Sequence, residues 1–235
     1  MIAHLKELRW WVQDYSYAAQ AQWRAGRSRA RPHGFSTGDR CPVVIIPGIY
    51  ERWQFLWPTM ARIHAAGHPV YTVDNLERNT DSIPRAADVV AALVVQHDLT
   101  NVVLVAHSKG GLIGKFVMLD LDSDERIVGM IAIATPFLGS AWARLMVAPS
   151  LRAFSARDPH IVALHARLGV NQKITSIYAG FDPHIPAGSV LPGARNIRID
   201  TVGHFRLLDD PRTVTAVLRV LDTYSNGSHR TGTAG

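Results

Sequence analysis

The chain has 235 residues, of which 47% are hydrophobic and 19% are charged, and this composition excludes a mainly disordered protein and a charged coiled coil. Its length suits a single α/β domain, and no apolar run reaches the roughly 18 residues that a membrane-spanning helix needs. The single cysteine, Cys41, excludes an intramolecular disulfide framework and a metal site built from cysteines.

The net charge of +6 is concentrated near the N-terminus. Residues 1–40 hold seven Lys and Arg against three Asp and Glu, which places +4 there and leaves +2 for the other 195 residues. The positive charge therefore belongs mainly to an N-terminal arm and is no mark of a nucleic-acid-binding fold. We expect no nucleic-acid partner.

Residues 1–40 predict an amphipathic N-terminal helix followed by a basic linker. Apolar side chains recur every three or four positions over residues 2–23, whereas residues 24–31 lose this period and hold four arginines. Two interpretations remain open for this arm. The helix docks on the main domain, or residues 1–31 make a peripheral contact with an anionic membrane surface, with tryptophans at the interface.

The first residues do not resemble a secretory signal. Such a signal needs a continuous apolar run, and here the charged residues Lys6, Glu7 and Arg9 break it. We therefore expect a cytoplasmic protein, which would be membrane-peripheral if the second interpretation of the arm holds.

The main domain, residues 41–225, alternates short apolar runs with segments of helical period. We expect strands at 42–46, 70–73, 102–106, 128–134, 174–179 and 196–199, and helices at 57–66, 85–98, 110–119 and 213–223. This order predicts a doubly wound, mainly parallel sheet of about six strands with helices on both faces. Functional residues should follow the carboxyl ends of the strands. Residues 226–235 are expected to form a disordered polar tail.

The segment around Ser108 carries the strongest functional signal. An apolar strand leads directly into Ala106-His107-Ser108-Lys109-Gly110, and a predicted helix follows at once. This context and the small residues on either side of the serine resemble the nucleophile elbow, Gly-x-Ser-x-Gly, of the α/β-hydrolase family. Alanine replaces the first glycine, as it does in some small bacterial lipases of that family. The resemblance implies an α/β-hydrolase fold in which Ser108 is the nucleophile.

A serine nucleophile needs a base and a group that orients the base. The family order along the chain is serine, acid, histidine. Asp182 and His204 each follow a predicted strand in that order, so the resemblance implies that Asp182 is the orienting acid and His204 the general base. Four rivals are less suited to these roles, since they lie in the elbow itself, in an earlier loop or beside the chosen pair: His107, Asp74, His184 and Asp200.

The resemblance also implies an oxyanion hole made of two backbone N–H groups. One is that of Lys109, directly after the nucleophile, and the other is that of Ile49, in the Pro47-Gly48-Ile49 loop after the first core strand. Because both donors belong to the backbone, we expect the side chains of Ile49 and Lys109 to vary freely.

The substrate pocket is expected near the same strand ends. A stretch like Thr135–Ser140 lines the pocket of lipases, and the candidate pocket residues are Tyr50, Phe137, Leu138 and Met146. Residues 140–172 form either a small cap or lid over the nucleophile or two ordinary helices that close the fold.

These residues predict a serine hydrolase that cleaves small-molecule or lipid esters with an apolar acyl group through an acyl-enzyme. Acyl transfer to an alcohol and thioester hydrolysis use the same residues and remain alternatives, and a non-catalytic binding module is the least favoured one. The sequence offers no convincing site for a metal or an organic cofactor, and we expect none. It leaves acyl length and oligomeric state open.

Overall fold

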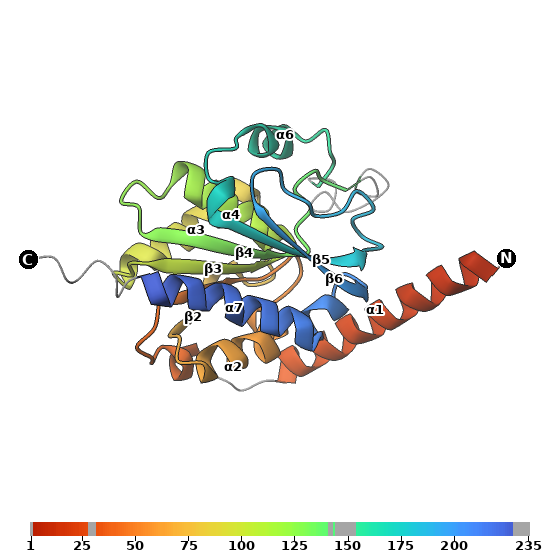
Figure 1. The fold of residues 1–235 in the computed structure, drawn as a ribbon, viewed down its shortest axis with the longest axis horizontal. Helices are drawn as coiled ribbons and strands as arrows, with labels where there is room; N and C mark the ends of the chain where they lie inside the picture. The colour runs from red at the N-terminus through yellow and green to blue at the C-terminus, as the bar shows by residue number, and fades with distance from the viewer. Residues whose placement is uncertain (1, 28–31, 141–142, 144–153, 228–235) are drawn as a thin grey trace, which may run out of the picture.

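Figure 1 shows the fold in a computed structural model of the 235-residue chain, which describes residues 2–27, 32–140, 143 and 154–227. The predicted tail at 226–235 lies outside the described residues from position 228 onward, as does part of the expected cap at 140–172.

A single sheet of six parallel strands organises the molecule, which confirms the predicted fold class. The strands follow the order β2-β1-β3-β4-β5-β6. Their bounds are β1 Val43–Ile46, β2 Val70–Thr72, β3 Val102–His107, β4 Ile127–Ile133, β5 Ile174–Phe181 and β6 Arg195–Val202. β5 and β6 run two to three residues past their expected ends, and so reach the positions directly before Asp182 and Gly203.

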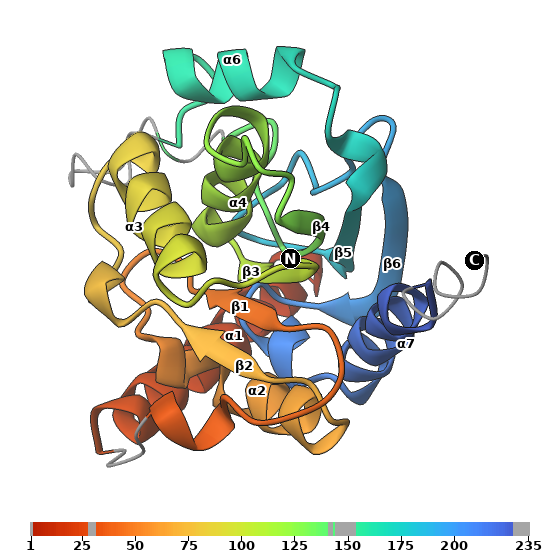
Figure 2. The ribbon, with the colours of Figure 1, turned by 90° about the vertical axis from the view of Figure 1, so that its left-hand side faces the viewer.

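The central strands are buried on both faces, because helices cover each side of the sheet (Figures 1 and 2). Val44 and Ile46 of β1 pack in the cluster that contains α3 (Ile83–Gln96) and α4 (Lys109–Asp120). Val43 and Ile45 face the opposite cluster, which contains α2 (Trp57–Ala65) and α7 (Pro211–Gly227). Alternate residues of one strand thus enter two separate cores, which explains its uninterrupted apolar sequence.

Short elements complete the fold. α6, Pro159–Ala166, lies over α4 on the far side from the sheet (Figure 2). The 3₁₀ turns are η1 Pro32–Phe35, η2 Trp53–Leu56, η3 Asp74–Leu76, η5 Asn171–Lys173 and η6 Arg206–Asp209. Of these, η2 and η6 follow the ends of β1 and β6, close to the predicted site.

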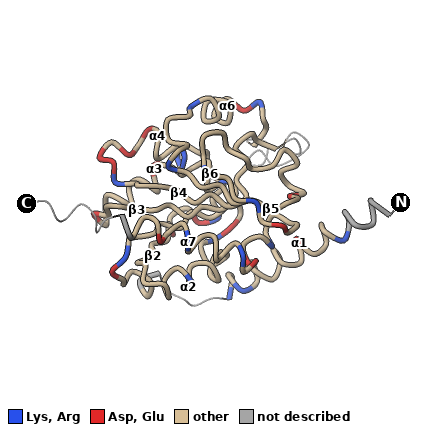
Figure 3. The backbone as a smooth tube through the Cα atoms, viewed as in Figure 1, with Lys and Arg blue, Asp and Glu red and all other residues tan. Residues whose placement is uncertain are grey.

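The N-terminal helix α1, Ile2–Arg27, packs against the same layer as α2 and α7, and its first turns project beyond the body of the protein (Figure 1). It ends at Arg27 rather than near Trp23. It packs mainly against η2 and η6, and Asp14, Ala21 and Ala25 on this face are buried. Figure 3 shows Lys and Arg at several separate places, including the last turn of α1. Among the described helices, none has the length and apolar character to cross a membrane.

Candidate active site

Ser108 lies in a tight turn between β3 and α4. Its backbone has φ 51° and ψ −118°, a combination that non-glycine residues rarely adopt. α4 begins so close to β1 that a Cβ on Gly110 would lie 2.3 Å from the carbonyl oxygen of Ile46. Ala106, which stands where the family motif has glycine, is fully buried, so a methyl group fits there. The strained turn therefore depends on small residues at both predicted positions.

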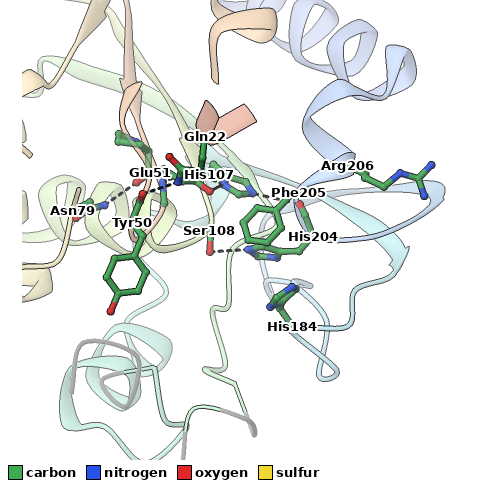
Figure 4. A network of polar contacts seen from close by, with 12 residues as sticks. Gln22, Tyr50, Glu51, Asn79, His107, Ser108, His184, His204, Phe205 and Arg206 are labelled. Carbon is green, nitrogen blue, oxygen red and sulfur yellow. Dashed lines mark hydrogen bonds and ion pairs between the residues drawn. The ribbon is translucent and has the colours of Figure 1, made fainter. Parts of the chain in front are cut away.

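The three predicted catalytic side chains meet at the carboxyl edge of the sheet. His204 Nε2 lies 2.9 Å from Ser108 Oγ (Figure 4), and His204 Nδ1 lies 2.7 Å from Asp182 Oδ2. The other oxygen of Asp182 accepts hydrogen bonds from the backbone N–H groups of His184 at 2.8 Å and Ile185 at 3.1 Å. This arrangement links a nucleophile to a base and the base to an orienting carboxylate.

The rival residues occupy other places. The His184 ring lies beside that of His204, with 5.0 Å between the ring centroids. Asp200 is exposed on β6, and Asp74 accepts a hydrogen bond from the Thr72 hydroxyl. His107 is fully buried and contacts Glu51 rather than Ser108.

The charges around His204 favour its protonated form. Burial lowers the pKa of His204, but the charge and hydrogen bond of Asp182, and the charges of Asp14 and Glu51, raise it overall. Burial raises the pKa of Asp182, but the charge and hydrogen bond of His204 and the backbone N–H of His184 hold it below its usual value. Asp182 is therefore charged at neutral pH, as an orienting acid must be.

The two predicted oxyanion donors lie on neighbouring loops. Lys109 is the first residue of α4, and the first N–H groups of a helix have no partner within it. Around Ile49 the backbone is held on both sides: Gly48 N–H donates to Glu51 Oε2 at 2.7 Å, and Tyr50 N–H donates to the Arg78 carbonyl at 2.6 Å. These bonds fix the loop that carries the Ile49 N–H.

The Lys109 side chain is buried and bonded, which differs from the expected freedom at this position. Its Nζ donates to the carbonyl oxygens of Asn79, at 2.8 Å, and Asp81. Asn79 in turn donates from Nδ2 to the Pro47 carbonyl at 2.8 Å. Burial lowers the pKa of Lys109 to about 8, against the opposing charge of Asp81. The side chain thus ties the elbow to the loop before Ile49.

A second buried acid–histidine pair lies near the serine, and no sequence motif pointed to its acid. Glu51 is buried, and its Oε1 lies 2.8 Å from His107 Nδ1. His107 Nε2 lies 3.4 Å from the carbonyl oxygen of His204 (Figure 4). The Glu51 carboxylate therefore connects the oxyanion loop, the elbow and the histidine loop.

A largely apolar cavity of about 350 Å³ opens beside Ser108 and His204. Tyr50 lines it as predicted. Phe137 is instead buried in the core beneath α3 and α4, and Leu138 is exposed, so neither is among its described lining residues. Met146 lies outside the described residues. One wall, which the motifs did not reveal, comes from α1 and consists of Trp11, Tyr15, Ala18 and Gln22.

The chain matches a family model described as "Alpha/beta hydrolase family" over residues 43–183, more than half of its length. The chain belongs to the alpha/beta hydrolase family. The matched range contains Ser108 and Asp182 and stops before His204, and it leaves out α1. For this hydrolase a comparison with curated proteins gave no match.

Solved structures resemble this hydrolase over most of its length. A monoacylglycerol lipase from Paleococcus ferrophilus is 14% identical with a TM-score of 0.60, and the comparison covers 81% of this chain and 97% of the lipase. A Bacillus licheniformis lipase is 14% identical with a TM-score of 0.61, and the comparison covers 77% of this chain and 92% of that lipase. A candidate non-heme bromoperoxidase from Mycobacterium tuberculosis is 18% identical with a TM-score of 0.61, and the comparison covers 80% of this chain and 94% of that protein. These likenesses show the fold, and the reaction must be argued from the site.

Proposed function

We propose that this α/β hydrolase cleaves carboxylic esters with an apolar acyl group through a serine acyl-enzyme. The observation that carries the proposal is the chain of contacts from Ser108 Oγ through His204 to Asp182, at 2.9 and 2.7 Å, in the wall of a cavity lined mostly by apolar side chains. Such a cavity suits an acyl chain, and the serine suits the ester carbonyl at its end.

The steps follow from the geometry. Ser108 Oγ attacks the carbonyl carbon and gives its proton to His204 Nε2, while Asp182 holds the Nδ1–H and stabilises the imidazolium. The N–H groups of Ile49 and Lys109 donate hydrogen bonds to the oxyanion, and each such donor stabilises the transition state by about 2.7–4 kcal/mol. The tetrahedral intermediate collapses, and the leaving alcohol takes the proton from His204. A water molecule then gives a proton to His204 and attacks the acyl carbon. The bond to Ser108 Oγ breaks, Oγ takes the proton back from His204, and the carboxylic acid is released.

The first test is a chain-length series of p-nitrophenyl esters on the parent protein and on Ser108→Ala. We expect the parent to hydrolyse them with an optimum set by the cavity, and Ser108→Ala to lose nearly all of this activity because the nucleophile is gone. A second test, which needs no turnover, is labelling by an organophosphonate. We expect one label per parent molecule and none on Ser108→Ala. An unlabelled parent protein would refute the proposal, and equal ester rates in both proteins would refute the role of Ser108.

The same assay distinguishes the alternatives that share the triad. Ester product formed from an added alcohol would indicate acyl transfer, and faster turnover of acyl-thioesters than of esters would indicate a thioesterase.

The acid limb of the pH dependence of kcat/KM should lie at higher pH than that of an enzyme whose base is an ordinary histidine. His204 must be neutral to accept the serine proton, and its pKa is raised above the usual 6.5 by Asp182, Asp14 and Glu51. As pH falls through this raised value, the fraction of neutral base falls, so activity should be lost beginning at higher pH than for an ordinary histidine. A kcat/KM profile against pH measures this, and an acid limb below 6.5 would contradict it.

A further inference from the structure

The N-terminal helix brings a buried carboxylate to the loop that carries His204. Asp14 of α1 is fully buried, and its Oδ2 accepts a hydrogen bond from the backbone N–H of His204 at 3.0 Å. Its Oδ1 accepts from the backbone N–H groups of Phe205 and Arg206, each at 3.0 Å. One side chain from the beginning of the sequence thus holds three consecutive amides of the histidine loop.

The approach of α1 to this loop is close enough to require a glycine beside the histidine. Gly203 has φ 122°, and a Cβ on it would lie 2.5 Å from Asp14 Oδ1. The adjacent residue of α1, Gln13, accepts a hydrogen bond from Arg206 Nη1 at 2.9 Å. Helix and loop are therefore fitted to each other through both backbone and side chains.

Asp14 also places a negative charge next to the catalytic histidine. Burial raises the pKa of Asp14, but the nearby His184 side chain and hydrogen bonds from the backbone N–H groups of Arg206 and His204 lower it overall, so the carboxylate is charged at neutral pH. His184 Nε2 lies 3.5 Å from Asp14 Oδ2.

The five charged and titratable groups that face His204 come from four parts of the fold, since Asp182 and His184 share the loop after β5. They are Asp182 after β5, Asp14 from α1, Glu51 from the loop after β1, and the rings of His107 at the end of β3 and of His184, each with its centroid 5.0 Å from that of His204.

We propose that Asp14 is a positioning residue for the hydrolytic reaction, fixing the backbone of His204 from α1 and stabilising the protonated imidazole with its charge. Asp182 orients the ring through Nδ1, whereas Asp14 orients the main chain from which the ring projects. The inference rests on the proposed function, because it assigns Asp14 a part in the same reaction. It makes α1 a component of the active site.

The test compares Asp14→Asn with Asp14→Ala in the full chain. Asparagine removes the charge and keeps one oxygen, which can still accept from the N–H groups of Phe205 and Arg206 while its amide group faces the His204 N–H, whereas alanine removes the charge and every acceptor. We expect Asp14→Asn to move the acid limb of kcat/KM for a p-nitrophenyl ester to lower pH. Asp14→Ala should in addition lower kcat/KM on the pH plateau by about 10- to 100-fold, because the ring loses its alignment. The matched control is Asp209→Asn, an exposed carboxylate of η6, which should change neither quantity.

Titration of the His204 ring by NMR supplies a readout that needs no substrate. If no ester is hydrolysed by the parent protein, the proposed function fails, and this titration still tests the effect of the Asp14 charge. We expect His204 to titrate at lower pH in Asp14→Asn than in the parent. An unchanged titration and acid limb in folded Asp14→Asn would overturn the inference. An equal loss of activity in both variants without a pH shift would also overturn it, since it would leave Asp14 a purely structural role.

Discussion

Asp182→Asn is expected to lower kcat by about 10⁴-fold while the protein still folds. The asparagine can keep an oxygen facing the N–H groups of His184 and Ile185, but its amide then points at His204 Nδ1. An amide donates where the carboxylate accepted, so it favours the tautomer of His204 that carries its proton on Nε2. That nitrogen faces Ser108 and can no longer take the serine proton. Steady-state ester hydrolysis measures the loss, and circular dichroism measures the fold.

Asp200→Asn is the matched control for this substitution. Asp200 is also an acid near the end of a late strand, but it is exposed on β6. We expect its replacement to leave kcat nearly unchanged, because its exposed carboxylate is not among the groups that act on His204, and to change the free energy of unfolding by no more than about 0.5 kcal/mol. If Asp200→Asn gave the larger loss of activity, the assignment of the orienting acid would be wrong.

Gly110→Ala is expected to destabilise the protein by about 3 kcal/mol or more and to reduce activity with it. The new Cβ would lie 2.3 Å from the Ile46 carbonyl oxygen and 2.9 Å from that of Pro47. Both obstacles are backbone, so they cannot move aside as a flexible side chain would. α4 would have to shift away from β1 and carry Ser108 with it. Urea unfolding gives the change in the free energy of unfolding.

Gly26→Ala tests whether the effect comes from this contact rather than from glycine replacement in a helix. Gly26 lies in α1 with no atom within 4 Å of an added Cβ. Alanine favours a helix by up to about 1 kcal/mol over glycine, so the variant should be as stable as the parent or more stable. A similar loss of stability in both variants would rule out the proposed clash.

Most of the fold could be predicted from the sequence because the central strands are buried on both faces and are therefore continuously apolar. β6, at one edge of the sheet, was predicted too short, at 196–199 instead of Arg195–Val202, because exposed Arg195, Asn196 and Arg198 interrupt its apolar pattern. α6 was not placed within residues 140–172, for which a cap or two helices were left open, although its start carries a recognisable signal. Asp158 accepts hydrogen bonds from the N–H groups at the start of the helix, and Pro159 is its first residue.

Ser108, Asp182 and His204 could be proposed from the sequence because they match the order of the family that the elbow resembles, and each lies within two residues of the end of a strand. Asp14 and Glu51 could not, since their partners lie 190 and 56 positions away and no local pattern records such contacts. Asp14 did leave one trace in the sequence: it stands one helical turn after Trp11 and one before Ala18, on the apolar face of its helix. A charged residue on such a face needs a buried partner.

The contact between Asp14 and His204 joins parts of the chain that are synthesised far apart in time. α1 precedes the loop that it holds, which follows 190 residues later. At about 5 to 20 residues per second, this interval lasts about 10 to 40 seconds. Ser108 emerges about midway through this interval, before His204. The hydrogen bonds from Asp14 to the N–H groups of residues 204–206 can therefore form only after residue 206 has been made and the two distant segments have met.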